Sequence, residues 1–363
     1  MRLAFLAAFA VGCSAAAAPP SEQVDPAREA APAGADADDD DDAPGGGGGG
    51  ACLPLRDCEA APFSFTPRGW RHTITSNAVT ALGSPRHRGR DFFANPGAPQ
   101  TIIGKFTYGA NDKDLVDEEV DVFAQAECDG DWTKLGTAIT TKDGAHATVD
   151  GVEDDGGRIY FDIPADKRLG PGRHRLRLVV AGDGTFADTF IDVVPEGTKV
   201  FVSDVDGTLT SSEEVEAAAL LGGFTPETHA SAPEALRALA AKGYRPLYLT
   251  ARPEMLTERT RAFVAERGFP PGLVRTSPFT TGAFQSEKAA RFKTAEMDLL
   301  AAKGLTPAFG FGNKTSDSNA YAKIPGEQNR IFYKIEGEFS GRRIESYAEL
   351  LPAFAELAAV CTP

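Results

Sequence analysis

Two aspartates one residue apart, Asp204 and Asp206, form the stretch of this sequence best suited to chemistry. They follow an apolar, β-rich run, Val200–Val202, and they precede Gly207 and the hydroxyl group of Thr208. Buried strands end in this way where a catalytic site lies at their carboxyl edge. The two like charges repel each other, and a divalent cation is the usual means of holding them together. An ordinary Asp-Gly turn is the alternative interpretation.

The residues after Thr210 alternate between helical and strand-like segments. Helices are predicted over 233–242, 258–267 and 288–302, and strands over 245–250, 273–277, 307–311 and 330–335. With the strand before Asp204, this alternation predicts an α/β domain over residues 199–363, with a parallel sheet and helices on both faces. Ligands of such sheets bind outside the carboxyl ends of the strands.

Further polar residues fall where these elements would bring them to that edge. Thr250 follows a predicted strand, Asn313 and Asp317 follow another, and Lys288 begins a predicted helix. Taken singly, Thr250 would be a helix cap, Lys288 a surface lysine and Asn313 part of a turn. Their order and their placement at strand ends favour a single functional site instead.

The order of these residues resembles the four motifs of the haloacid dehalogenase (HAD) superfamily of phosphatases. The segments Tyr248–Arg259, Lys288–Lys293 and Phe311–Asp317 narrow the resemblance to the C-terminal domain shared by lipins and Nir-type phosphatidylinositol-transfer proteins. In that family the domain either hydrolyses phosphatidate or binds it. The binding-only members lack the nucleophilic aspartate, so the presence of Asp204 favours catalysis.

The resemblance implies a role for each residue of the site. Asp204 would attack phosphorus and form an aspartyl-phosphate, while Asp206 would protonate the leaving alcohol and later deprotonate water. Thr250 and Lys288 would bind phosphoryl oxygens. Lys293 is a second candidate for the lysine, but Lys288 better fits the start of a helix.

The resemblance also implies a metal ion and further substrate contacts. Mg²⁺ would be held by Asp204, Asp206, Asn313 and Asp317, and would activate the nucleophile. Thr208 and Arg252 would contact the substrate. The neutral amide of Asn313 differs from the aspartate that is more common in HAD phosphatases.

The amino terminus is expected to act as an export signal. A positively charged start, an apolar run to Val11 and then Gly12-Cys13 predict a signal peptide over residues 1–13. The stretch Ala10–Cys13 resembles a bacterial lipobox, which implies lipidation of Cys13 and a membrane-anchored lipoprotein on the periplasmic side. Ordinary cleavage within Ala15–Ala18 is the alternative. Residues 14–59 are rich in Asp and Gly and predict a disordered linker.

Four further cysteines are present in the chain. They are Cys52, Cys58, Cys128 and Cys361. An even number of cysteines in an exported protein suggests disulfides, and four cysteines allow three pairings. Closeness in sequence favours Cys52 with Cys58, which would leave Cys128 with Cys361 to tie the two domains together.

Residues 60–198 show a period-two alternation that predicts an antiparallel β-sandwich of the immunoglobulin-like type. Basic residues crowd one loop-rich part of it, namely Arg68, Arg71, His72, Arg86, His87, Arg88 and Arg90. This cluster is either a patch for anionic lipid headgroups or phosphate, or a structurally paired set, and the second interpretation is favoured.

The net charge of −15 lies to a large extent in the first fifty residues, so nucleic acid is not an expected partner. No apolar run is long enough for an ordinary membrane span. We expect a Mg²⁺-dependent phosphatase that acts on phosphatidate or a related lipid phosphate at a membrane surface. The alternatives are a HAD phosphatase for soluble phosphomonoesters and a noncatalytic phosphatidate-binding module.

Overall fold

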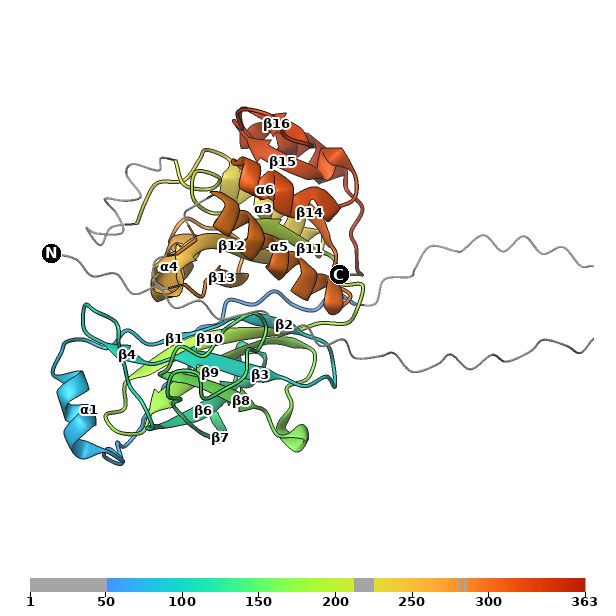
Figure 1. Cartoon of the computed structure of the whole chain (residues 1–363). Coiled ribbons are helices and arrows are strands. Elements are labelled where there is room, and N and C mark those ends of the chain that lie inside the picture. Colours follow the sequence, from blue (N-terminus) through green and yellow to red (C-terminus); the bar gives the residue numbers. More distant parts are fainter. Residues whose placement is uncertain (1–50, 212–224, 280–281, 284–285, 363) are drawn as a thin grey trace, which may run out of the picture. The chain divides into compact units, whose positions relative to one another are not determined.

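The structure, a computed structural model, describes residues 51–211, 225–279, 282–283 and 286–362 (Figure 1). The predicted signal peptide, the lipidation site Cys13 and most of the predicted linker lie outside these residues. All described residues belong to one unit, residues 48–363. Among the helices of the described ranges, none combines the length and the apolar character needed to cross a membrane.

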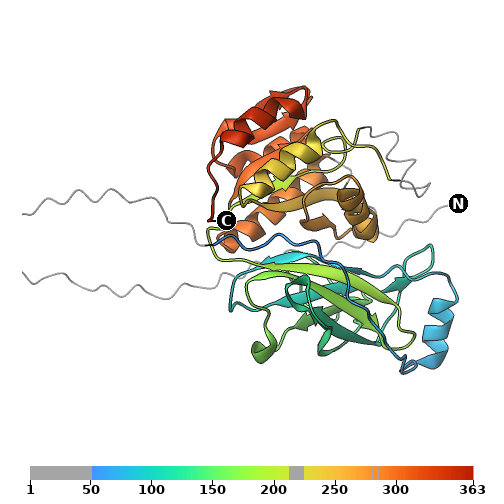
Figure 2. The same cartoon turned by 180° about the vertical axis from the view of Figure 1, so that it is seen from behind.

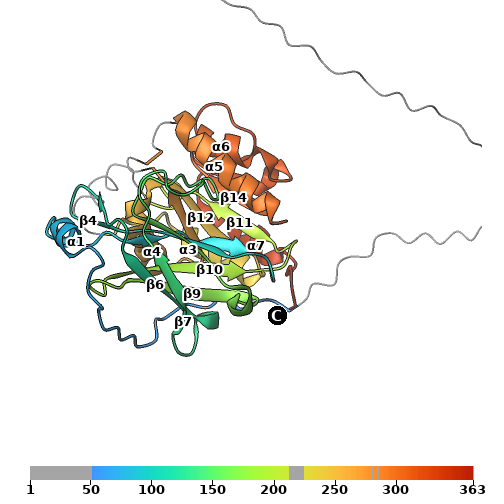
Figure 3. The same ribbon diagram turned by 60° about the horizontal axis from the view of Figure 1, so that its bottom comes forward.

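The amino-terminal domain is a β-sandwich, as predicted. One sheet has the strand order β2-β10-β9-β6-β7, and the other has the order β1-β3-β8. The strands are β1 (Arg88–Gly89), β2 (Phe92–Ala94), β3 (Thr101–Lys105), β6 (Glu119–Gln125), β7 (Thr133–Ile139), β8 (Arg158–Asp162), β9 (Gly172–Val180) and β10 (Phe186–Val193). Helix α1 (Thr73–Thr80) precedes them, and β4 (Thr107–Tyr108) pairs with β5 (Lys113–Asp114). Figure 3 shows β10, β9, β6 and β7 side by side.

Strands β1 and β2 belong to one stretch of chain that leaves one sheet and enters the other at Arg90 and Asp91. β1 pairs antiparallel with β3, whereas β2 pairs parallel with β10. Alternate side chains of the two sheets point inward and meet in one core, which includes Ile102, Val122 and Leu178.

The carboxyl-terminal domain contains a six-stranded parallel sheet in the order β13-β12-β11-β14-β15-β16. Figure 2 shows this domain, coloured yellow to red, from behind. The strands are β11 (Val200–Ser203), β12 (Arg245–Pro253), β13 (Leu273–Ser277), β14 (Pro307–Gly312), β15 (Arg330–Tyr333) and β16 (Arg342–Ile344). The described helices are α3 (Ala232–Ala241), α4 (Thr257–Glu266), α5 (Ser286–Ala302), α6 (Thr315–Ala320) and α7 (Leu351–Glu356). The predicted α/β class is confirmed.

Helices cover both faces of this sheet because its strands carry apolar side chains on both sides. Along β11, Phe201 points to one face, whereas Val200 and Val202 point to the other. The face of Phe201 packs against α3, α4 and α7, and the opposite face packs against α5 and α6. A strand buried on both faces is typical of parallel sheets.

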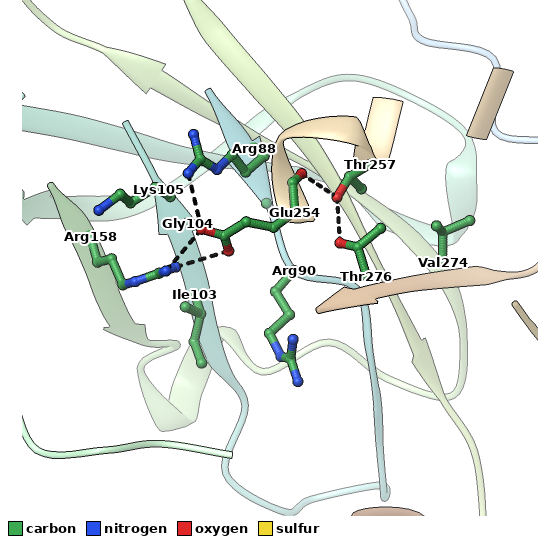
Figure 4. A pocket seen from close by; sticks show the side chains of 11 residues that line it. Arg88, Arg90, Ile103, Gly104, Lys105, Arg158, Glu254, Thr257, Val274 and Thr276 are labelled. Atoms are coloured by element: carbon green, nitrogen blue, oxygen red, sulfur yellow. Dashed lines mark hydrogen bonds and ion pairs between the residues drawn. The ribbon is translucent and has the colours of Figure 1, made fainter. Parts of the chain in front are cut away.

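Most of the basic residues between 68 and 90 are paired within the protein, which confirms the structural interpretation for them. The pairs are Arg68 with Glu119 and Asp121, Arg71 and His72 with Asp117, Arg88 with Asp112 and Glu254, and Arg90 with Glu296. In Figure 4, the Glu254 carboxylate lies between the guanidinium groups of Arg88 and Arg158. Both arginines belong to the sandwich and Glu254 to the α/β domain, so these ion pairs join the two domains.

A second contact between the domains centres on the fully buried carboxylate of Asp91. It accepts hydrogen bonds from the Arg261 guanidinium at 2.5 Å and from the backbone N–H of Val274 at 2.9 Å, both in the α/β domain. It also accepts one from the N–H of Phe190 in the sandwich at 2.9 Å. A buried carboxylate is tolerated only with such partners, because its desolvation costs several kcal/mol. Asp91 therefore couples the folding of both domains.

The four cysteines form disulfides, but the favoured pairing is wrong. Cys52 is bonded to Cys361, and Cys58 is bonded to Cys128. Closeness in sequence misled the prediction because residues 52–70 contain no turn that would bring Cys52 back to Cys58. The backbone N–H of Cys52 instead bonds to the carbonyl of Thr362 at 2.7 Å. Residues 52 and 58, which fall within the predicted linker of residues 14–59, are thus each held by a disulfide.

We expect Asp91→Ala to lower the free energy of unfolding by about 3–5 kcal/mol, because it removes the buried carboxylate that pairs with Arg261 and accepts the N–H groups of Val274 and Phe190. The exposed Glu345, which pairs with Arg343, provides the control: Glu345→Ala should cost less than about 1 kcal/mol. Urea unfolding measures both. Equal effects of the two substitutions would contradict the role of Asp91.

The burial of His87 predicts that the free energy of unfolding depends on pH. Burial lowers the pKa of His87 from 6.5 to about 4, and its neutral ring accepts a hydrogen bond from the N–H of Thr107 and bonds to the hydroxyl of Thr185. Between these pH values the unfolded chain binds a proton that the folded chain excludes. The stabilisation is therefore complete above about pH 6.5 and falls as the pH drops toward 4.

The free energy of unfolding of the wild-type protein should fall between pH 7 and pH 5, and His87 should account for about 2 kcal/mol of that fall. We expect the fall to be smaller by this amount in His87→Gln. Urea unfolding at the two pH values gives the difference. The exposed His146 is the control, and His146→Gln should leave the wild-type difference in place. A His87→Gln protein with the wild-type difference would contradict the assignment.

Candidate active site

The order of the strands places two functional loops next to each other. Strand β11 ends at Ser203 and is followed by Asp204, while the adjacent β14 ends at Gly312 and is followed by Asn313. From β11 the chain proceeds to β12 and β13 on one side, and from β14 to β15 and β16 on the other. Ligands of α/β sheets bind at such a switch point, at the carboxyl ends of the strands. The N–H of Asp204 bonds to the carbonyl of Phe311 at 2.9 Å and joins the two loops.

The loop after Asp204 turns back so that Thr208 contacts it. Gly207 has a φ of +73°, a left-handed conformation that glycine adopts without strain. The Thr208 hydroxyl lies 3.0 Å from Oδ2 of Asp204 and 3.2 Å from Oδ1 of Asn313. The Thr208 carbonyl accepts a hydrogen bond from the Tyr347 hydroxyl at 2.8 Å. A single buried threonine thus links the ends of β11 and β14.

Lys293 of helix α5 supplies the positive charge of the site. Its Nζ atom lies 2.6 Å from Oδ1 of Asp204 and 2.5 Å from Oδ1 of Asp317. All three side chains are buried, with 5% or less of each exposed. The ammonium group therefore offsets two carboxylates that would otherwise repel each other in a medium of low polarity.

Burial raises the pKa of Asp204, and the neighbouring carboxylates of Asp317 and Asp206 raise it further, although Lys293 opposes them. Burial also acts to lower the pKa of Lys293, but Asp204 and Asp317 outweigh it, so that this pKa is raised. The lysine consequently keeps its charge. Perturbed pKa values of this kind are frequent at functional sites.

Asp317 is fixed in place by the start of helix α6. Its Oδ2 atom accepts hydrogen bonds from the backbone N–H groups of Asn313 at 3.0 Å and Lys314 at 3.1 Å. Gly312 leaves room for this arrangement, since a Cβ atom there would lie 2.4 Å from the Cβ of Asp317. Asp317 thus uses one oxygen to organise the loop and the other to hold Lys293.

Asp206 lies in a second set of contacts at the end of β12. Its Oδ1 atom accepts hydrogen bonds from Nε of Arg252 at 2.8 Å and from Nη2 at 2.7 Å. Its Oδ2 atom accepts one from the hydroxyl of Thr250 at 2.8 Å. Arg252 and Thr250, predicted to contact substrate, therefore hold Asp206, and 21% of the Asp206 side chain remains exposed.

The predicted metal ligands do not all face one point. Asp317 bonds to Lys293 and to backbone N–H groups, and Asp206 bonds to Arg252. Within the described residues, no group of three Asp, Glu, His or Cys side chains could hold a metal ion. Two of the predicted ligand atoms remain for a metal ion, Oδ2 of Asp204 and Oδ1 of Asn313. Both lie near the Thr208 hydroxyl. Mg²⁺ fits this pair, because it is often bound by one or two carboxylates and keeps several waters.

The structure corrects the choice of lysine. Lys288 lies with its Nζ atom 3.9 Å from the centre of the Phe279 ring, whereas Lys293 contacts Asp204. Five residues along a helix correspond to a rotation of about 140°, so the two lysines point in different directions. Lys288 was favoured for its place at the start of the helix, but the phase of the helix decides which lysine reaches the site.

Sequence reasoning missed an aromatic support for the Asp204 loop. The ring of His229 stacks on Tyr333 with 3.9 Å between centroids, and Tyr333 stacks on Tyr347 at 5.6 Å. His229 Nε2 lies 3.2 Å from the carbonyl of Gly207, and Tyr347 bonds to the carbonyl of Thr208. These residues lie far apart in sequence and form no motif, so no sequence signal was available to find them.

The fold and the site together define a class of protein: a β-sandwich followed by a HAD-like α/β domain with carboxylates at its switch point. Comparison with family models agrees with both parts. Residues 85–193 match the β-sandwich domain of PITM 1-3, and residues 201–334 match the LNS2 domain of PITM 1-3. The chain therefore carries a match to each of the two domains, the sandwich before the LNS2 domain, and the predicted resemblance to the Nir-type transfer proteins is supported.

Individual relatives bear this out. Membrane-associated phosphatidylinositol transfer protein 2 of Homo sapiens is 35% identical over 190 residues, which are 52% of this chain and 13% of the relative. Membrane-associated phosphatidylinositol transfer protein 1 of Rattus norvegicus is 31% identical over 61% of this chain and 16% of the relative. Protein retinal degeneration B of Drosophila melanogaster is 30% identical over 73% of this chain and 19% of the relative. The chain thus spans less than a fifth of the length of these relatives.

The two lysines of α5 provide a matched test of the site. We expect Lys293→Met to lower the free energy of unfolding by about 3–5 kcal/mol, because two buried carboxylates lose their counter-charge. Lys288→Met should cost less than about 1 kcal/mol. Urea unfolding at pH 7.5 in the presence of EDTA measures both. A larger loss for Lys288→Met than for Lys293→Met would show that the site is wrongly assigned.

Proposed function

We propose that the α/β domain of this chain is a magnesium-dependent phosphatase that hydrolyses a phosphate monoester, with phosphatidate or a related lipid phosphate as substrate. The observation that carries the proposal is the environment of Asp204. This carboxylate lies at the switch point, with an ammonium group on one oxygen and a hydroxyl group on the other. A phosphoryl group bound there would meet a nucleophile beside a fixed positive charge.

In the first step, a carboxylate oxygen of Asp204 attacks phosphorus. The bond between phosphorus and the alcohol oxygen breaks, and its electron pair leaves with that oxygen. Lys293 offsets the negative charge that Asp204 and the phosphoryl oxygens share. Mg²⁺, held by Asp204 and Asn313, would neutralise further charge on the phosphoryl group. The products are the free alcohol and a phosphorylated Asp204, which water then hydrolyses.

Asp206 is the group that moves protons. Arg252 and Thr250 hold its carboxyl group in place, which suits a base that deprotonates the attacking water. To protonate the leaving alcohol, Asp206 must first take up a proton, and its partly exposed side chain can receive one from solvent. Thr250 keeps the carboxyl group oriented in both steps.

The names of the relatives support a lipid as the substrate, since they are membrane-associated proteins that transfer a phospholipid. Lipidation of Cys13 and export to the periplasmic side remain predictions, and they rest on residues outside the described ranges. If both hold, the anchor would keep the enzyme at the surface that contains its substrate.

A noncatalytic phosphatidate-binding module is the second candidate. The observation that favours it is that both oxygens of Asp206 already accept hydrogen bonds within the protein, Oδ1 from Arg252 and Oδ2 from Thr250. A binding module would use Lys293 and Thr208 to hold the phosphate group without cleaving it. The two candidates differ in whether phosphate is released.

We expect the full-length protein to release inorganic phosphate from phosphatidate vesicles when Mg²⁺ is present, and EDTA to stop the release. Asp204→Asn should reduce the rate by at least about a thousandfold, because it removes the nucleophile. The exposed Asp166 is the control, and Asp166→Asn should keep the full rate. A colorimetric phosphate assay measures all three proteins.

The other outcomes separate the candidates. Magnesium-dependent release by the Asp204→Asn protein would exclude the nucleophile assigned here. Specific binding to phosphatidate vesicles without release would favour the binding module. Faster release from para-nitrophenyl phosphate than from phosphatidate would indicate a phosphatase for soluble phosphomonoesters.

A further inference from the structure

A cavity lies beside helix α5, away from the carboxylates of the candidate active site. It has a volume of about 300 Å³, which is within the range of pockets that bind small molecules. Its lining comes from α5, from Pro278 and Phe279 after β13, and from Asp150 and Gly151 of the sandwich. The cavity therefore lies where a loop of the sandwich meets the α/β domain.

The walls of this cavity are mainly apolar. Phe292, Ala295 and Leu299 lie on one face of α5, because their spacing of three and four residues matches the helical repeat. Phe279 contributes an aromatic wall and is 38% exposed, which is high for a large apolar side chain. Such a partly exposed apolar surface in a concavity is typical of a binding site.

Two positive charges line the cavity. The Lys288 ammonium lies over the ring of Phe279, and the Arg291 side chain is 75% exposed, with Glu287 as a distant partner at 3.9 Å. Exposed pairs of this length contribute little, so the charge of Arg291 remains available to a ligand. The lining also includes the carboxylate of Asp150, whose Oδ2 atom lies 3.6 Å from Nζ of Lys303.

The inner part of the cavity holds a neutralised ion pair. Glu296 is buried and bonds to Arg90 and Arg275, so that its charge does not repel an anion.

We infer that this cavity binds a single fatty acyl chain that carries an anionic group at one end. The apolar faces of Phe279, Phe292 and Leu299 would contact the chain, and Lys288 and Arg291 would bind the anionic group. A free fatty acid and a lysophospholipid share this chemistry. An anion without a chain would leave the apolar walls exposed, and a neutral chain would not use the charges of Lys288 and Arg291.

The inference does not depend on the phosphatase proposal. Lys293, which contacts Asp204, is rotated by about 100° around α5 from its neighbour Phe292. The cavity and the carboxylate site therefore use different faces of one helix. Binding of the acyl chain should persist in a protein that has lost Asp204.

The test is isothermal titration calorimetry of the full-length Asp204→Asn protein with oleate and, separately, with 1-oleoyl lysophosphatidate, both below the concentrations at which they form micelles, and the variants below are made in this background. The wild-type protein is titrated with oleate alone, because lysophosphatidate is a phosphate monoester that the proposed active site would bind or cleave. We expect the wild-type protein and Asp204→Asn to bind oleate with equal affinity. Ala295→Trp should weaken binding at least about tenfold, because the exposed Ala295 lies at the cavity and an indole ring would fill it. Replacing both Lys288 and Arg291 by Gln should weaken it at least about fivefold.

The exposed Lys113 of the sandwich is the control, and Lys113→Gln should bind as the wild type does. Phe279→Ala serves as a second cavity variant should Ala295→Trp fail to fold, and acetate tests whether the chain is needed. Binding of oleate supports a free fatty acid as ligand, and binding of lysophosphatidate alone supports a phospholipid. The inference is overturned if neither lipid binds, if acetate binds equally well, or if the cavity variants bind as the wild type does.

Discussion

The site depends on one buried ammonium group, that of Lys293, between Asp204 and Asp317. Each carboxylate alone would lose several kcal/mol on transfer from water to this interior, and the two together would repel each other. Lys293 can serve both because β11 and β14 are adjacent in the sheet, so that Asp204 after β11 and Asp317 after β14 lie close together. The same carboxylate contacts the Thr208 hydroxyl through its other oxygen, so the charge balance and the position of Asp204 are linked.

The two domains are joined by a similar use of charge. Asp91 of the sandwich pairs with Arg261 of the α/β domain. Glu254 of the α/β domain pairs with Arg88 and Arg158 of the sandwich. Such pairs contribute less to stability than apolar packing would, but removing one partner is costly. They consequently favour one relative placement of the domains. Arg88 and Arg90 of the basic loop serve this purpose through Glu254 and Glu296. Arg68, Arg71 and His72 instead pair with carboxylates of the sandwich itself.

Much of the α/β domain could be predicted because its pattern is local. The apolar run before Asp204 and the helical period over 288–302 correspond to β11 and to α5 (Ser286–Ala302). The site at the strand ends follows from a general rule for parallel sheets. The partners of Asp206 could not be predicted in this way. Arg252 was expected to contact substrate, but it lies within hydrogen-bonding distance of Asp206 because β12 is adjacent to β11.

The sequence by itself determined the class of fold, the nucleophile loop and the set of polar residues that follow strands, since these depend on short-range periodicity and on residue type. The tertiary structure decided between Lys288 and Lys293, because the rotation of a helix relative to the sheet is set by packing of its apolar face. It also decided the disulfides, since Cys52 and Cys361 meet at 5.0 Å between Cα atoms although 309 residues separate them. Long-range contacts of this kind follow from how whole elements pack, and no local spacing encodes them.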